Sequence, residues 1–169
     1  PGAPSFIYVR SDLAHQMQSP ISGWFGHAAP FAFDPEYRAQ EGVARFAAGT
    51  PGVLSLAALD AALAAFADVD MSNAARKAKA LGELVITRAD ALGLEVISPR
   101  DSSVRGGHVS IRHPEGYAIV QALIARGIIP DFRAPDAIRF GVSPLFLRFA
   151  DVWDAVQQLA DILATQLLP

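Results

Sequence analysis

The sequence predicts a mixed protein of the α/β to α+β class that ends in a small lobe, a sheet covered by helices. Three observations lead to this prediction. The 169 residues are enough to bury a sizeable core. The hydrophobic content of 51% and charged content of 18% exclude a disordered tail. After residue 93, short β-type runs alternate with helical patterns, which is typical of a small sheet with helices on one face.

The first 70 residues carry one predicted strand, one long irregular segment and one predicted helix. Residues 5–10 are rich in β-branched and aromatic residues, which predicts a buried strand. Residues 19–53 are interrupted by Gly and Pro and hold six aromatic side chains, which indicates a functional or interface segment. Residues 55–67 return to a helical pattern with Ser55 as the N-cap. The expected apolar face of this helix consists of Leu56, Leu59, Leu63 and Phe66.

A longer helix is expected over residues 72–92, with Gly93 as its stop. Its length and the change of pattern after it suggest a connector between two lobes. Its expected apolar stripe consists of Leu81, Leu84, Val85 and Leu92.

The last part of the chain alternates strands with helices. The predicted strands are residues 94–97, 108–112, 128–129 and 137–142, and the predicted helices are residues 115–126 and 151–167. The first of these helices should bury Tyr117, Val120, Leu123 and Ile124. The last should start from Asp151 as N-cap and bury Val152, Val156, Leu159, Leu163 and Leu167.

Composition argues against several classes of partner. A formal net charge of -3 with only two lysines disfavours nucleic acid. The absence of cysteine excludes disulfides and thiolate metal sites. The four histidines include no pair at i, i+4 spacing, so no metal site is expected. The apolar stretches are too short to span a bilayer and no export signal opens the chain, so no membrane partner is expected.

A few residues stand out as candidates for binding. Arg139 is the single charge in an apolar predicted strand, where it either faces solvent or holds a carboxylate. The aromatic turn at residues 24–27 could be a core corner. Thr50 places a hydroxyl just before a helix, which suits an anion or an ordinary loop. Arg105 and His108 flank two glycines, which indicates either an anion contact or a turn. The residues alone thus give no complete catalytic set.

Blocks of sequence spread in order over nearly the whole chain resemble the kynureninase family. The blocks are GWFGH (23–27), RFAAGTP (45–51), RGGHVS (105–110), RGIIPDFRAP (126–135), IRFG (138–141), SPLF (143–146) and FADVW (149–153). The first block is fairly specific, whereas the final helix is not.

The resemblance implies a pyridoxal-phosphate (PLP) enzyme of fold type I, the fold shared with class V aminotransferases. Residues 1–70 would then be the C-terminal portion of the large domain and residues 71–93 the connecting helix. Residues 94–169 would be a small C-terminal domain whose mostly antiparallel sheet is covered by helices.

The resemblance also implies an activity. Kynureninases are hydrolases that act on a carbon–carbon bond in ketonic substances and convert L-kynurenine to anthranilate and L-alanine. This places the enzyme in the kynurenine pathway of tryptophan catabolism, which leads to NAD biosynthesis. A cytoplasmic homodimer with its active site at the subunit interface is expected. Thr50 stands where animal members carry Asn, which indicates a bacterial protein.

Four residues match functional positions of the family. Trp24 is similar to the tryptophan whose indole N–H reaches the cofactor phosphate, and Thr50 matches a second phosphate contact. Both are expected to act from the neighbouring subunit. Arg139 matches the arginine that grips the substrate α-carboxylate, and Phe25 should help to line the pocket for the aryl ring. The resemblance leaves the roles of Arg105 and His108 open.

One departure bears on activity. The family's Schiff-base lysine lies upstream of the segment matched here, and neither Lys77 nor Lys79 matches it. We therefore expect this chain to be the C-terminal part of a kynureninase, inactive without its N-terminal part. Two alternatives are a non-enzymatic small-domain module and part of another fold type I enzyme, such as a class V aminotransferase or a cysteine desulfurase.

Overall fold

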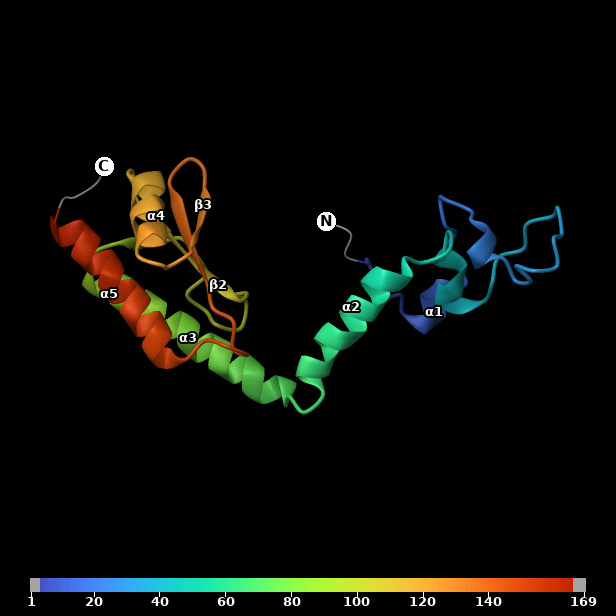
Figure 1. Cartoon of the computed structure of the whole chain (residues 1–169), viewed down its shortest axis with the longest axis horizontal. Helices are drawn as coiled ribbons and strands as arrows, with labels where there is room; N and C mark the ends of the chain where they lie inside the picture. Colours follow the sequence, from blue (N-terminus) through green and yellow to red (C-terminus); the bar gives the residue numbers. More distant parts are fainter. Residues whose placement is uncertain (1–3, 166–169) are drawn as a thin grey trace. The chain divides into compact units, whose positions relative to one another are not determined.

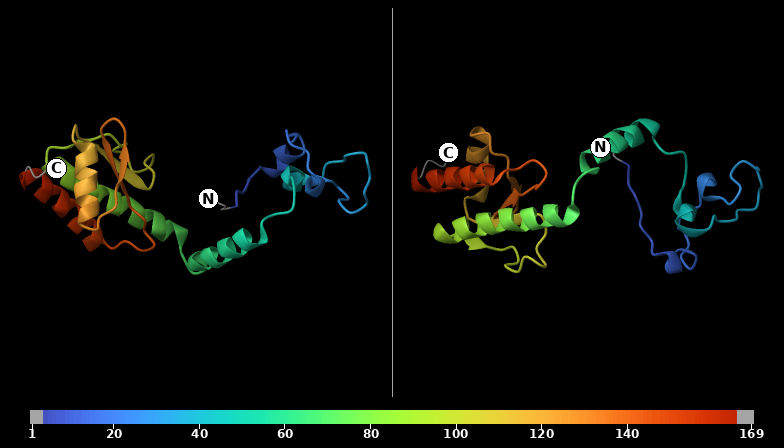
Figure 2. Two further views of the ribbon diagram at one scale, coloured as in Figure 1. Left: turned by 45° about the horizontal axis from the view of Figure 1, so that its top comes forward. Right: turned by 90° about the horizontal axis from the view of Figure 1, so that it is seen from below.

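The structure is a computed structural model that describes residues 4–165 of the chain (Figure 1). Contacts divide the chain into two units, Pro1–Asp68 and Val69–Pro169. The first unit consists of short helices and irregular segments, and the second holds a sheet and three long helices (Figure 2).

The second unit contains a four-stranded sheet in which every neighbouring pair is antiparallel. Its strands are β1 (Glu95–Val96), β2 (His108–Arg112), β3 (Asp131–Arg133) and β4 (Ala137–Gly141), in the order β1-β2-β4-β3. The long central pair aligns His108 with Gly141 and Arg112 with Ala137. The sheet confirms the predicted mixed class and its antiparallel character.

The two central strands alternate strictly between a buried and an open face. The side chains on the buried face are those of Val109, Ile111, Ile138 and Phe140. Ser110 and Arg139 lie opposite each other on the other face, where both are half-buried. Because successive residues of a strand point to opposite faces, one strand serves the core and the open face at once.

Three helices cover the buried face of the sheet. They are α3 (Met71–Ala91), α4 (Gly116–Ala125) and α5 (Phe149–Thr165). Helices α3 and α5 pack along each other, and α4 packs against β3 and β4 (Figure 1). The helices add these side chains to the core: Leu81, Val85, Ile86, Ala89, Ile119, Val120, Leu123, Val152, Val156, Leu159 and Ile162. Each buried Leu, Ile or Val side chain contributes about 1.5–3 kcal/mol, so this core stabilises the second unit.

Helix α3 confirms the longest predicted helix almost to its ends. Its N-cap is Asp70, whose carboxylate accepts from the backbone N–H of Ser72 at 2.8 Å and of Asn73 at 3.2 Å. Hydrogen bonds from Ser72, first from its side chain, and from Asn73 hold the pKa of Asp70 below its usual range. The helix stops at Gly93, whose φ of 70° is the left-handed conformation that favours glycine. Its buried stripe places it in the second unit.

Two predictions for the second unit are wrong: a strand at residues 128–129, and Asp151 as the N-cap of the last helix. The strand predicted at residues 128–129 is instead the exit from α4: the Ile128 N–H donates to the Leu123 carbonyl at 3.0 Å after Gly127, with φ of 80°. The strand comes later, as β3. The final helix starts at Phe149, and Asp151 lies inside it, accepting from the Arg148 N–H at 2.7 Å.

The predicted buried faces of α4 and α5 are right in their centres and wrong at their edges. Tyr117 and Ile124 are exposed, and Ile119 is fully buried in their place. In α5 the prediction omitted Ile162, which is buried, while Leu167 lies outside the described residues. A helical face is wider than one stripe, so spacing alone leaves its edges undetermined.

The first unit has little regular structure before its main helix. Its elements are α1 (Ser11–Ala14), η1 (Trp24–Gly26), η2 (Gly42–Phe46), α2 (Val53–Leu63) and η3 (Ala64–Phe66). The strand predicted at residues 5–10 is wrong, since residues 5–10 form no strand in the structure and Phe6 and Tyr8 are exposed. A strand needs a hydrogen-bonded partner, which the pattern of one segment does not reveal.

Helix α2 is apolar without burying any residue. Its predicted inner face is exposed: Leu56 by 38% and Leu63 by 55%. Its N-cap is Gly52 rather than Ser55, whose hydroxyl instead donates to the Gly52 carbonyl at 2.9 Å. A helix of this composition is typical of a protein interior. Among residues 4–165, no helix combines the length and the apolar character that crossing a membrane requires.

Candidate functional site

Arg139 lies on β4, on the open face of the sheet. In the register of the sheet it stands between Ser110 on β2 and Asp131 on β3. Its side chain is 32% exposed, and its guanidinium pairs with the Asp131 carboxylate through Nη2. The charge that stood out in an apolar strand therefore belongs to the face that the helices leave open.

Asp131 is a residue that sequence reasoning missed. Its Oδ2 accepts from Arg139 and also from Arg133 Nε, at 2.7 Å. Asp131 and Arg133 are two residues apart on β3 and so share a face. That i, i+2 spacing is a signal in the sequence, but it is visible only once β3 has been placed.

The structure gives Arg105 a structural contact. Its side chain is only 3% exposed and pairs with Glu83 on α3. Its Nη1 also donates to the carbonyls of Pro99 and Arg100, each at 3.0 Å. Arg105 therefore fastens the segment before β2 to α3. His108, at the start of β2, is exposed.

Trp24 and Phe25 lie in η1 of the first unit. Their rings meet edge to face with centroids 5.0 Å apart, and Trp24 meets Phe31 in the same way at 5.7 Å. Trp24 is 46% exposed. Aromatic side chains held rigidly in a turn cost little conformational entropy when they meet a ligand.

His27 anchors this aromatic turn from inside. It is buried, and its Nδ1 accepts from the Ala29 N–H at 2.9 Å. Because Nδ1 accepts, the proton of a neutral ring sits on Nε2, which lies 3.0 Å from the Glu36 carbonyl and donates to it. The Tyr37 hydroxyl donates to the Gly26 carbonyl at 3.1 Å. The histidine of the turn is thus a structural residue.

Two glycines of the turn lie against the segment that leads to Thr50. A Cβ at Gly23 would stand 1.7 Å from the Ala48 carbonyl oxygen, and one at Gly26 would stand 2.5 Å from that of Ala47. Only glycine permits this approach. The segment carrying Trp24 and the segment preceding Thr50 are therefore packed together, which sequence spacing did not predict.

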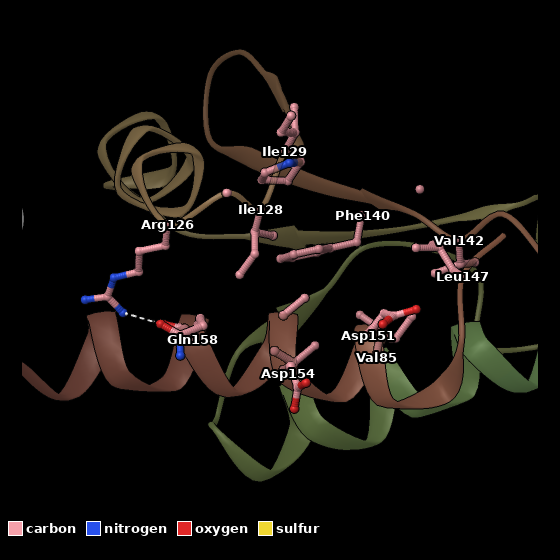
Figure 3. A pocket seen from close by; sticks show the side chains of 16 residues that line it. Val85, Arg126, Ile128, Ile129, Phe140, Val142, Leu147, Asp151, Asp154 and Gln158 are labelled. Atoms are coloured by element: carbon pink, nitrogen blue, oxygen red, sulfur yellow. Dashed lines mark hydrogen bonds between the residues drawn. The ribbon is translucent and has the colours of Figure 1, made fainter.

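A cavity lies elsewhere, in the second unit (Figure 3). It measures about 630 Å³ and lies among β4, α5 and the segment after α4. Its apolar walls include Ile128, Phe140 and Val152, and Arg126 at its edge donates to the Gln158 Oε1 at 3.0 Å. None of the predicted site residues lines it. A smaller hollow of about 360 Å³ is lined in part by Trp24, His27, Phe33 and Tyr37.

Within residues 4–165, no three His, Asp or Glu side chains are grouped so as to hold a metal ion. The donors at the candidate positions are of a different kind: an indole N–H at Trp24, a hydroxyl at Thr50 and a guanidinium at Arg139. Such donors suit phosphate and carboxylate groups.

The fold defines the class of protein. The chain is similar to the cystine C–S lyase C-DES in complex with its product cysteine persulfide, with a TM-score of 0.75 and 22% identity over 91% of this chain and 41% of that one. It is also similar to the cysteine desulfurase CsdA from Escherichia coli, with a TM-score of 0.69 and 24% identity over 96% and 42%. The chain thus has the fold of fold type I PLP enzymes.

Sequence comparison gives the family. The model of the kynureninase C-terminal domain matches residues 74–159. The kynureninase of Pseudomonas fluorescens is 46% identical over 96% of this chain, and that of Burkholderia mallei 44% identical over 98%. The chain belongs to the kynureninase family, and it covers 40% and 41% of these two relatives. A C-DES variant with glycine covalently linked to its PLP cofactor is also similar, with a TM-score of 0.75 and 22% identity over 91% of this chain and 40% of that one. Together with the family, it supports pyridoxal 5′-phosphate as the cofactor.

Proposed function

We propose that this chain is the C-terminal part of a kynureninase. The complete enzyme cleaves the Cβ–Cγ bond of L-kynurenine with one molecule of water and releases anthranilate and L-alanine. The observation that carries the proposal is Arg139: a guanidinium on the open face of the small sheet, held at one nitrogen by Asp131. Family membership supports this reaction, and Arg139 offers a guanidinium that suits the carboxylate of the substrate.

Arg139 binds the α-carboxylate of the substrate in this proposal. A guanidinium has five N–H donors in a planar fork and matches a carboxylate with two parallel hydrogen bonds. Asp131 uses Nη2. Fixing the carboxylate at this point orients the bonds at the substrate's Cα, a contribution that positioning alone makes to the rate.

Trp24 and Thr50 hold the phosphate of the cofactor. An indole N–H and a hydroxyl are neutral donors that a phosphate dianion can accept from, and both residues are exposed. The packing of Gly23 against Ala48 keeps their two segments together. Phe25, which packs edge to face on Trp24, lines the pocket for the aryl ring. When bound, PLP supplies the electron sink for the reaction.

The Schiff-base lysine comes from outside this chain. Lys77 and Lys79 both lie on α3, and the Lys77 ammonium donates to the Pro144 carbonyl at 2.8 Å. Lys77 is therefore held within the second unit. In the proposed homodimer, Trp24 and Thr50 complete the site of the neighbouring subunit, and the 169-residue chain alone has no turnover.

The test is product analysis with the protein extended to the length of its relatives. With PLP and L-kynurenine we expect anthranilate and L-alanine in equal amounts, and none from the 169-residue chain. L-Cysteine serves as the competing substrate because the structural neighbours act on carbon–sulfur bonds. If the protein releases sulfide from cysteine and no anthranilate from kynurenine, the proposed reaction is wrong. The protein then catalyses a different reaction known for enzymes of this fold.

A further inference from the structure

We infer that Asp131 is a positioning residue for substrate binding: its carboxylate sets the guanidinium of Arg139 so that the rest of the fork receives the α-carboxylate. This inference rests on the proposed function, and in particular on the role of Arg139. Asp131 is distinct from every residue that the family resemblance placed in the site.

The register of the sheet brings the two residues together. Asp131 on β3 is the direct partner of Arg139 on β4, and the neighbouring pair Phe132–Ile138 lies on the core side. The two backbones are therefore fixed by the ladder, and the ion pair fixes the side chain of Arg139 above them. A long arginine side chain otherwise keeps considerable rotamer freedom.

The contact between Asp131 and Arg139 indicates that Asp131 holds the guanidinium in place rather than competing with the substrate for it. Asp131 Oδ2 accepts from one nitrogen of Arg139, Nη2, and the same oxygen accepts from the Nε of Arg133 at 2.7 Å. Because Arg133 anchors the carboxylate independently, Asp131 does not need to leave when a ligand arrives. A competing carboxylate would instead occupy two nitrogens of the fork, as a substrate does.

The pair contributes little to folding, which makes its role testable. The side chains of Asp131 and Arg139 are 44% and 32% exposed, and ion pairs with this exposure add little to stability. Replacing Asp131 should therefore leave the fold intact. Asp136 provides a matched control, because it lies in the turn between β3 and β4 and pairs with Arg112, at 3.3 Å.

The experiment compares Asp131→Ala, Asp131→Asn and Asp136→Ala in the full-length enzyme. For Asp131→Ala we expect the KM for kynurenine to rise about tenfold with kcat changed by less than about threefold, since a mispositioned fork weakens binding of the carboxylate. Asp131→Asn keeps an oxygen acceptor and should recover part of the loss. Asp136→Ala should behave as the unsubstituted enzyme does.

A second measurement ties the effect to the carboxylate. The inhibition constants of L-alanine and of L-alaninamide, which lacks the carboxylate, are measured for the same variants. Asp131→Ala should weaken inhibition by L-alanine and leave inhibition by L-alaninamide unchanged. An unchanged KM and unchanged inhibition overturn the inference while the function stands. A lowered KM would mean that Asp131 competes with the substrate for Arg139, which also overturns the inference. An equal effect of Asp136→Ala would mean that the change in KM is a general effect of removing a negative charge, and it overturns the inference as well. No anthranilate from the unsubstituted enzyme overturns the function and the inference together.

Discussion

Arg139 and Asp131 are direct partners across β4 and β3, and the guanidinium of one donates to the carboxylate of the other. The pair lies on the face of the sheet opposite the core, while Ile138 and Phe140 on the same strand are buried under the helices. Strand β4 thus contributes to the core of the second unit with one face and places the candidate binding residue on the other.

Arg139→Lys should damage substrate binding. Lysine keeps the charge but loses the planar fork, so two parallel hydrogen bonds to the carboxylate become one contact. We expect the KM for kynurenine in the full-length enzyme to rise about 10–100-fold. Arg112→Lys, on strand β2, where the arginine pairs with Glu95 and Asp136, is the control and should leave the KM within about twofold. An unchanged KM in Arg139→Lys would remove Arg139 from the site.

Gly23→Ala should disrupt the first unit. The added Cβ would stand 1.7 Å from the Ala48 oxygen, a backbone atom that cannot rotate away. We expect a loss of about 1–3 kcal/mol or more, as for other overpacked positions, and poorer retention of PLP. Gly49→Ala is the matched control, since a Cβ there meets nothing within 4 Å. Thermal unfolding and visible absorbance of the full-length enzyme distinguish the two, and equal behaviour of both variants contradicts the close approach.

Arg105→Met should destabilise the second unit without touching the candidate site. The side chain is almost wholly buried and satisfies Glu83 and two backbone carbonyls. Removing it loses these hydrogen bonds, one of them between two charged groups, at a cost of about 1.5–3 kcal/mol. Urea unfolding should show this loss, while Arg100→Met, whose pair with Asp90 is largely exposed, should show much less. Equal losses would mean that burial of Arg105 is unimportant.

Asp151 should make stability depend on pH at the acid end. The hydrogen bond from the Arg148 side chain lowers the pKa of Asp151 to about 2, from an ordinary value of 3.8. A depressed folded-state pKa means that the stabilisation is complete above about pH 4 and is lost as the pH falls towards 2. The difference in Tm between the unsubstituted protein and Asp151→Asn should therefore shrink over that interval. A difference that stays constant from pH 5 to 2 contradicts the assignment, and Asp154→Asn on the same helix is the control.

Much of the second unit could be predicted from the sequence because its elements have complete periodic patterns. The alternation at residues 108–112 and the stripe beginning at Leu81 both correspond to buried faces. Residues 5–10 have the composition of a strand, yet no strand forms there, because pairing depends on segments that a local pattern does not describe.

The candidate site could be predicted only in part. Arg139 stood out by its charge in an apolar strand, but Asp131 became visible only through the register of β3 with β4. The roles of Trp24, Thr50, Phe25 and Arg139 stay predictions that come from the family resemblance. The close approach of Gly23 to Ala48 could not be foreseen, because the two positions are far apart along the chain.

The contact between Gly23 and Ala48 also bears on how related sequences can diverge. Position 23 admits no side chain for as long as the first unit folds in this way, whatever the protein does. Trp24 is partly exposed, and under the proposed function its constraint comes from the phosphate contact rather than from the fold. Positions 23 and 24 are thus constrained in different ways, the first by backbone packing and the second by the proposed ligand. We therefore expect a relative that keeps the glycine and has lost the tryptophan to keep the packing of this turn without the proposed phosphate contact.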